Sequence, residues 1–147
     1  MTLSEAKDIA TIIGVIVAVV SLAATAYNIN INMKINRAKF WLDLRTAFSK
    51  HDEVHQRLRP GGDWTNNAEP ANVSDMAKIE AYMGLFEHCE SMLKEKLIDK
   101  ETFRNIYSYR LHNLVANKWV KEKKLRDHKL EWERFIELLN EMKIKYD

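Results

Sequence analysis

Residues 9–33 read IATIIGVIVAVVSLAATAYNININM, a stretch without a charged side chain. About 20 such residues cross the roughly 30 Å hydrocarbon core of a bilayer at 1.5 Å per residue. The stretch is apolar around nearly its whole circumference, which is unusual for a helix buried in a small soluble domain. We therefore expect residues 1–33 to form a short outer N-terminus and a transmembrane helix.

The same segment has one feature of a cleaved signal peptide. Residues 24–26 (ATA) resemble a small-residue cleavage site. Signal peptides carry a positively charged leader, however, and here Glu5 and Asp8 accompany Lys7. An uncleaved anchor is therefore the better prediction.

Basic residues follow the span rather than precede it. Lys34, Arg37, Lys39 and Arg45 come soon after it, whereas Lys7 is the only basic side chain before it. The positive-inside rule places the carboxyl side of such a span in the cytoplasm. We expect a single-pass protein of the inner (plasma) membrane with its N-terminus outside. Lys34, Arg37 and Lys39 are expected to contact anionic lipid headgroups.

Small and polar side chains recur along one face of the span, at alternating spacings of three and four residues. This polar seam comprises Thr11, Gly14, Ala18, Ser21, Thr25, Asn28 and Asn32. Its period is that of a left-handed supercoil, and small residues let membrane helices approach closely, so the seam predicts a homo-oligomer. Ala10, Gly14 and Ala18 equally fit a right-handed small-xxx-small dimer. In a ring of many subunits the seam would line a polar pore, and the sequence leaves dimer and ring open.

Residues 34–147 are densely charged and predict a cytoplasmic helical bundle, so the expected fold class is all-α. Between residues 32 and 59 there is no Gly or Pro, which indicates a helix that continues directly from the span. Residues 60–73 hold both prolines and predict a loop, whose Trp64 is expected to fold back onto the helices. Ser74 and Asp99 are predicted N-caps of the next two helices, and a further link is expected between residues 121 and 128.

Apolar side chains at helical spacing indicate the buried faces of the bundle. The predicted core residues are Phe40, Trp41, Leu44, Phe48, Val54 and Leu58, then Ile79, Tyr82, Met83, Phe86, Cys89, Leu93 and Leu97, then Phe103, Ile106, Tyr107, Leu111, Leu114 and Trp119, and finally Trp132, Phe135, Ile136, Leu139 and Met142. Cys89 is the only cysteine, so no intrachain disulfide can form.

His51 and His55 have the spacing of metal ligands on one helix face. The stretch HDEVH is close to the HExxH zinc motif, with Asp52 in place of its glutamate. The shorter acid would misplace a catalytic base, and His88 or Cys89 is merely available as a third ligand. We therefore predict neither a metal site nor a cofactor.

A second pattern involves arginine and histidine. Arg45 with His51, and Arg104 and Arg110 with His112, approach the Arg-x4-6-His signature of HEPN ribonucleases, although Arg104 to His112 has one residue too many. Arginine and histidine there bind phosphate and act on a 2′-hydroxyl. A Gly-rich phosphate loop, a nucleophile elbow and a CxxC pair are missing from the sequence, and the net charge of +2 does not indicate nucleic-acid binding. We predict a protein that is not an enzyme, with a membrane-tethered ribonuclease as the alternative.

Four stretches carry a family resemblance: residues 79–87 (IEAYMGLFE), residues 97–103 (LIDKETF), Trp119 and residues 132–135 (WERF). With the span, they resemble an uncharacterised bacterial family of small single-pass membrane proteins with a helical cytoplasmic domain. The layout is also similar to the small membrane accessory protein of type VI-B CRISPR systems. That resemblance implies a ring-forming, pore-making antiviral effector that acts with a defence-system protein. An anchor or adaptor for a cytoplasmic partner is the remaining alternative.

Overall fold

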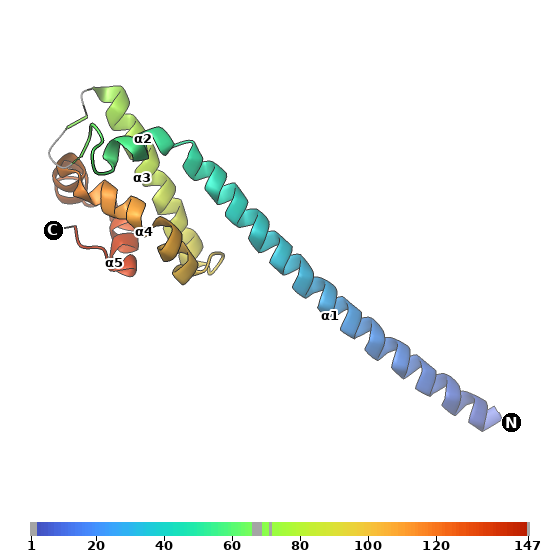
Figure 1. The fold of residues 1–147 in the computed structure, drawn as a ribbon. Coiled ribbons are helices and arrows are strands. Elements are labelled where there is room, and N and C mark those ends of the chain that lie inside the picture. The colour runs from blue at the N-terminus through green and yellow to red at the C-terminus, as the bar shows by residue number, and fades with distance from the viewer. Residues whose placement is uncertain (1–2, 66–68, 71, 147) are drawn as a thin grey trace. The chain divides into compact units, whose positions relative to one another are not determined.

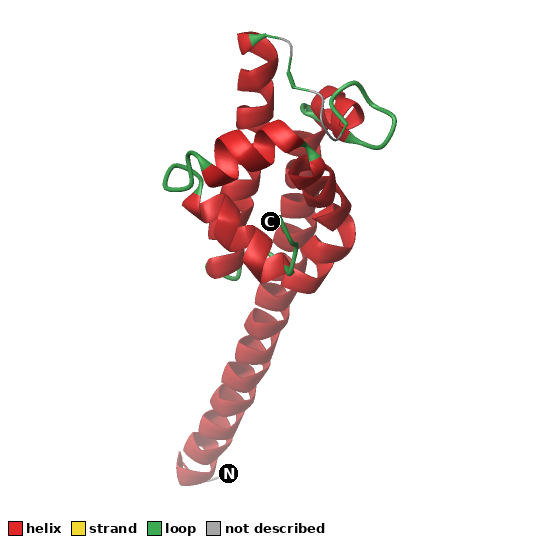
Figure 2. Ribbon diagram, turned by 90° about the vertical axis from the view of Figure 1, so that its left-hand side faces the viewer, coloured by secondary structure: helices red, strands yellow, loops and turns green. Residues whose placement is uncertain are grey.

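The structure, a computed structural model, describes residues 3–65, 69–70 and 72–146. Every regular element within these ranges is a helix, which confirms the all-α prediction (Figures 1 and 2). The elements are α1 (Leu3–Ser49), α2 (Asp52–Leu58), α3 (Val73–Lys94), α4 (Lys100–Ala116), the π-helix η1 (Val120–Arg126) and α5 (Glu133–Met142).

The chain divides into two compact units, Met1–Leu42 and Asp43–Asp147. The division lies nine residues after the boundary drawn at residue 33 from the sequence. The two boundaries describe different features. Residue 33 is where the uncharged stretch ends, whereas the division after Leu42 is where α1 begins to pack into the bundle.

Helix α1 extends without interruption from Leu3 to Ser49, as the absence of Pro in this range allows. Continuation of the helix beyond the apolar stretch was predicted and is confirmed. A single helix as far as Arg59 is wrong, because a turn at Lys50 and His51 separates α1 from the short helix α2. His51 has φ −109° and ψ 15°, which are not helical values, and its N–H donates to the Phe48 carbonyl over 3.0 Å.

Aromatic side chains from four helices form the centre of the bundle. Phe48, in the last turn of α1, stacks on Tyr107 of α4 with 4.1 Å between ring centroids. Phe86 of α3 lies 4.9 Å from Phe48 and 6.1 Å from Phe135 of α5. Such pairs add to the free energy of apolar burial, so this aromatic cluster joins the end of α1 to the rest of the bundle.

Most of the predicted core is buried, with two clear exceptions. Leu97 is 54% exposed and Ile106 is 45% exposed. Leu97 follows the end of α3, in the link to α4, where helical spacing no longer determines which way a side chain points. Ile106 precedes buried Tyr107 on α4 and lies off the face that packs inward.

Polar side chains cap two of the helices. Asn72, rather than the predicted Ser74, is the N-cap of α3, and its side-chain carbonyl accepts the Asp75 N–H over 2.9 Å. Asp99 caps α4 as predicted, accepting the Thr102 N–H over 2.7 Å. Both arrangements satisfy backbone donors that a helix start leaves without partners.

An ion pair connects α3 and α5 at the bundle surface. Lys94 Nζ lies 2.7 Å from Glu90 Oε1 and 2.6 Å from Glu137 Oε2. The Glu90 side chain is almost fully buried, so the lysine neutralises a carboxylate that has little contact with water. Its hydrogen bonds with Glu137 and Glu90 raise the pKa of Lys94.

The loop after α2 folds back onto the helices, as predicted for Trp64. Gly61 begins it with φ +86°, a conformation that side chains disfavour, and Gly62 lies so close to the Arg57 carbonyl that a Cβ would not fit. Trp64 is buried, and the Arg57 guanidinium lies 4.8 Å from the centroid of its ring.

Asn117 connects this loop to the end of α4. Its side-chain amide donates to the Trp64 carbonyl over 2.6 Å and accepts the Val120 N–H over 3.1 Å. The link expected somewhere between residues 121 and 128 begins at the end of that range, because η1 extends to Arg126 and a turn over residues 127–132 leads to α5. Buried Val120 and Leu125 explain why η1 folds onto the bundle.

We predict that Asn117→Ala destabilises the bundle by about 1–3 kcal/mol, because buried groups of Trp64 and Val120 lose their hydrogen-bond partner. Urea or thermal unfolding of the detergent-solubilised chain measures the change. Asn140→Ala, at an exposed position of α5, serves as the control. Equal unfolding midpoints for the two variants would contradict the role assigned to Asn117.

Candidate functional site

Arg110 lies at the centre of a polar cluster where α2, α3 and α4 meet. Its guanidinium donates to Asp52 Oδ1 over 2.8 Å, to the Tyr82 hydroxyl over 3.4 Å and to the Tyr109 hydroxyl over 3.1 Å. The same group lies 5.7 Å from the centroid of the Phe48 ring. One half-buried cation thus connects the aromatic core to three polar side chains.

Two histidines complete the cluster. The His51 ring stacks on Tyr82, with 5.4 Å between centroids and 27° between the planes. His55 is 8% exposed and packs edge-on against Tyr109. Its Nδ1 is buried and has no hydrogen-bond partner among the described residues. An imidazole nitrogen in this state is available to a bound ligand or water.

Burial and neighbouring charge keep both histidines neutral. Burial lowers the pKa of His51, with a further contribution from Lys50. Burial also lowers the pKa of His55, and the Arg110 cation adds to the effect. Burial opposes the charge on Arg110, but its hydrogen bonds with Tyr82 and Asp52 outweigh this and raise its pKa. Burial raises the pKa of Tyr82 as well. At neutral pH the cluster therefore combines a permanent cation with two uncharged imidazoles.

A pocket of about 550 Å³ opens beside this cluster. It is lined by Asp52, His55, Gln56, Arg59, Pro60, Tyr109 and Asn113. The volume lies within the range of small-ligand pockets. A neutral imidazole beside an arginine can accept a proton from a bound hydroxyl group, while Arg59 at the rim can hold an anionic group.

The structure does not assemble the metal site considered for His51 and His55. His51 precedes α2 and lies against Tyr82, so the two imidazoles do not share a regular helix face. No group of three His, Cys, Asp or Glu side chains suited to a metal ion occurs within the described ranges. Cys89 is buried, and burial raises the pKa of its thiol to about 12.

Nor does one chain bring the HEPN-like candidates together. Arg110 and His112 are two residues apart on α4 and point roughly 160° apart around the helix. Arg110 faces Asp52, whereas His112 is exposed. Arg104 lies more than two turns before His112, and its buried Nε has no hydrogen-bond partner among the described residues. Arg45 is exposed on α1, whereas His51 stacks on Tyr82.

The polar seam lies on the exposed surface of α1. Gly14, Ala18, Ser21, Thr25, Asn28 and Asn32 are all exposed, whereas the Thr11 side chain lies outside the described residues. The Thr25 hydroxyl donates to the Ser21 carbonyl over 2.8 Å. This bond within the helix satisfies the hydroxyl donor in an apolar medium. Lys34, Arg37 and Lys39 follow the seam on the same helix and are exposed too.

Sequence reasoning did not identify Asp52, Tyr82 and Tyr109 as members of the polar cluster. Asp52 and Arg110 are 58 residues apart, and no local spacing signals their contact. Tyr82 was assigned to the core, and its ring is indeed buried. Its hydroxyl, however, accepts a hydrogen bond from Arg110 and so belongs to the polar cluster.

No family model matches the chain, and no curated protein or solved structure matches it either.

The lowered pKa values of His51 and His55 predict that the stability of the fold depends on pH. In the unfolded chain the pKa of both histidines returns to the ordinary value of 6.5. Around and below that pH the unfolded state therefore binds protons that the folded state does not. The free energy of unfolding is therefore expected to be constant above about pH 7 and to fall between about pH 6.5 and pH 5. Thermal unfolding of the detergent-solubilised chain at several pH values measures this.

His51→Phe/His55→Phe should flatten this dependence, because neither replacement takes up a proton. His88→Gln/His128→Gln, which changes two exposed histidines, is the matched control and should retain the wild-type slope. A slope that persists in the first double variant would rule out the two cluster histidines as its source.

Proposed function

We propose that α1 crosses a lipid bilayer and associates with copies of itself along the polar seam, so that the protein is an oligomeric single-pass membrane protein. In its more specific form, the oligomer perturbs or permeabilises the inner membrane during bacterial defence against phage. The bundle would then lie in the cytoplasm and respond to a defence-system partner.

The observation that carries the proposal is the complete exposure of the described part of the uncharged stretch of α1, residues 13–33. Every residue from 13 to 33 is exposed, including Ile13 at 55%, Val17 at 58% and Leu22 at 70%. The helix is long and apolar enough to cross a membrane: its most apolar 18-residue window has a mean hydropathy of 1.7, and none of that window is buried. Water disfavours an apolar surface of this size, so lipid or other protein must cover it.

The length of the apolar stretch and the charges that follow it agree with a lipid bilayer as the environment that surrounds it. Residues 9–33 make a helix of about 37 Å at 1.5 Å per residue, which spans a hydrocarbon core of roughly 30 Å with some tilt. The first charged residue after them is Lys34, and Arg37 and Lys39 follow within two turns. This arrangement supports a cytoplasmic bundle.

The polar seam supports self-association within the bilayer. Gly14 has open space around its Cα, so a second helix can approach closely there. The Asn28 and Asn32 side chains carry amide groups that lipid cannot pair, whereas a neighbouring subunit can. The Thr25 hydroxyl already bonds within its own helix, which fits a dry helix pair as well as a pore. The defence role rests on the resemblance carried by residues 79–87, 97–103 and 132–135.

Membrane insertion can be tested with charges in the middle of α1. We predict that Val17→Asp/Val20→Asp moves the chain out of the membrane fraction, because each carboxylate costs about 3 kcal/mol at the centre of a span. Val17→Leu/Val20→Leu is the matched control and should remain in the membrane fraction through an alkaline carbonate wash. A wild-type chain that stays soluble and monomeric without detergent would overturn the proposal.

Permeabilisation can be tested in liposomes. The purified oligomer is expected to release a trapped small dye, and Ser21→Leu/Asn28→Leu should reduce both the release and the subunit number. The reason is that these changes remove polar groups from the seam while keeping the span apolar. Val19→Leu, at an apolar position off the seam, is the control. Native mass spectrometry in detergent gives the subunit number.

Two outcomes would indicate another function, and a third would contradict the pore alone. A stable dimer without dye release, together with one stoichiometric cytoplasmic partner, would indicate an anchor or adaptor. RNA cleavage by the purified protein that is lost in Arg104→Ala or His112→Ala would indicate a membrane-tethered ribonuclease. A confirmed ring that releases no dye when its trigger is present would contradict the pore.

A further inference from the structure

The π-helix η1 is the least regular element of the bundle. Its backbone is bonded from residue i to residue i+5, as in the 3.0 Å bond from the Asp127 N–H to the Glu122 carbonyl. π-Helical turns are rare and occur frequently at functional sites. The wide turn places residues four and five apart on one side, so that Lys121, Leu125 and Arg126 face the same space.

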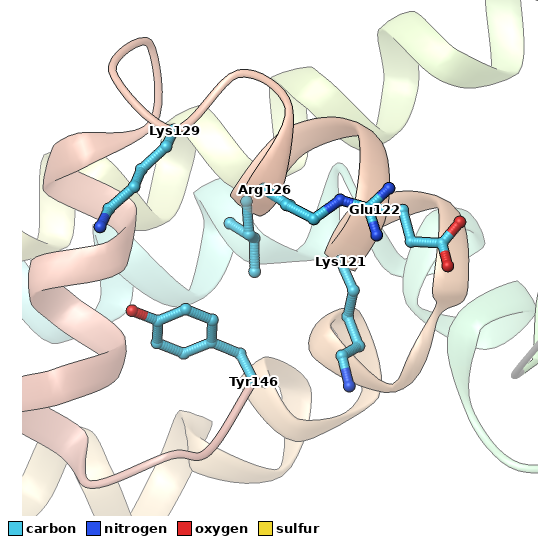
Figure 3. Close-up of a pocket in the computed structure, with 6 residues that line it drawn as sticks. Lys121, Glu122, Arg126, Lys129 and Tyr146 are labelled. Atoms are coloured by element: carbon cyan, nitrogen blue, oxygen red, sulfur yellow. The ribbon is translucent and has the colours of Figure 1, made fainter.

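That space is a pocket of about 510 Å³ between η1, Lys129 and the C-terminal segment. Lys121, Glu122, Leu125, Arg126, Lys129 and Tyr146 line it. Figure 3 shows Lys129 and the hydroxyl end of Tyr146 on one side of the pocket, while Arg126 extends toward Glu122 on the other. The lining carries three cations and one carboxylate, and this excess of positive charge favours an anionic ligand.

The pocket also has an apolar part that the fold holds in place. Leu125 is buried and forms one surface of the pocket. Lys143, at φ 60°, turns the chain back after α5, and buried Ile144 attaches the C-terminal segment to the bundle. Tyr146 therefore presents its half-buried ring to the pocket. An aromatic ring beside an aliphatic side chain is a surface on which a planar group can stack.

The basic residues around the pocket differ in whether they form ion pairs with the rest of the bundle. Lys124, on the other side of η1, pairs with Glu80 and lies 4.9 Å from the Trp119 ring centroid, so it supports the fold. Arg126 bonds to Asp127 through Nε alone, which leaves the terminal nitrogens of its guanidinium to a ligand. Lys129 forms no ion pair with any residue that the structure describes. The cations beside the cavity are thus placed for a phosphate group.

We propose that this pocket binds a mononucleotide. Its phosphates would lie among Lys121, Arg126 and Lys129, and its base would stack on Tyr146 beside Leu125. The volume is of the size that small-ligand sites have, and the combination of clustered cations with one aromatic ring is the chemistry that a phosphorylated ring compound requires. This site is separate from the Arg110 cluster and does not depend on membrane insertion by α1.

Isothermal titration of the full chain in detergent tests the proposal with AMP, ATP, adenosine and inorganic phosphate. We expect AMP and ATP to bind more tightly than adenosine or phosphate alone. Arg126→Ala and Lys129→Ala should each weaken nucleotide binding about tenfold, the loss expected for one charge-assisted hydrogen bond. Tyr146→Ala should weaken AMP binding and leave phosphate binding unchanged. Lys123→Ala, on η1 but outside the pocket lining, is the matched control and should bind as the wild type does.

Every other outcome overturns the site. Absence of heat with all four compounds at millimolar concentration excludes a nucleotide, and equal binding by Arg126→Glu/Lys129→Glu and the wild type excludes this pocket. If phosphate and AMP bind alike and Tyr146→Ala changes neither, the site binds simple anions only. Binding to vesicles that contain phosphatidic acid, without competition from AMP, would assign the cations to lipid headgroups instead.

Discussion

An exposed apolar helix constrains this protein more than any contact inside it. Residues 13–33 place aliphatic side chains around most of α1 outside the polar seam, and all of these residues are exposed. A soluble chain would resolve this by folding the helix into a core, yet the bundle completes its core with Leu44 and Phe48, from the end of the same helix. The chain thus carries two apolar regions, one buried within the bundle and one exposed along α1.

The bundle combines a dry aromatic centre with a polar cluster that closes one side of it. Phe48 contacts both, because Tyr107 stacks on its ring and the Arg110 guanidinium lies over it. Burying a cation in this position is costly without partners, and Asp52 and the two tyrosine hydroxyls supply them. The same burial keeps His51 and His55 neutral, so the features that stabilise the cluster also determine its protonation.

Elements with strong local signals were predictable. The uncharged run indicated α1, the two prolines indicated the loop, and Asp99 indicated a helix start because its carboxylate can accept a nearby N–H. Weaker signals failed at helix ends. Asn72 caps α3 in place of Ser74, since both residue types can cap and two positions separate them. The π-helix was missed because its basic sequence resembles a solvated link, whereas Val120 and Leu125 hold it against the bundle.

The amino-acid sequence by itself determined the helical class, the uncharged apolar stretch, the charges that follow it and the seam of small and polar residues. Each of these depends on neighbours a few positions apart, for which helical periodicity is a sufficient guide. Only the tertiary structure decided that Asp52 meets Arg110, that His112 faces away from that cluster, and that Tyr146 lies beside the cations of η1. Asp52 and Arg110 are 58 positions apart, and Tyr146 is 20 or more positions from Lys121 and Arg126, so these arrangements follow from how whole helices pack rather than from any local pattern.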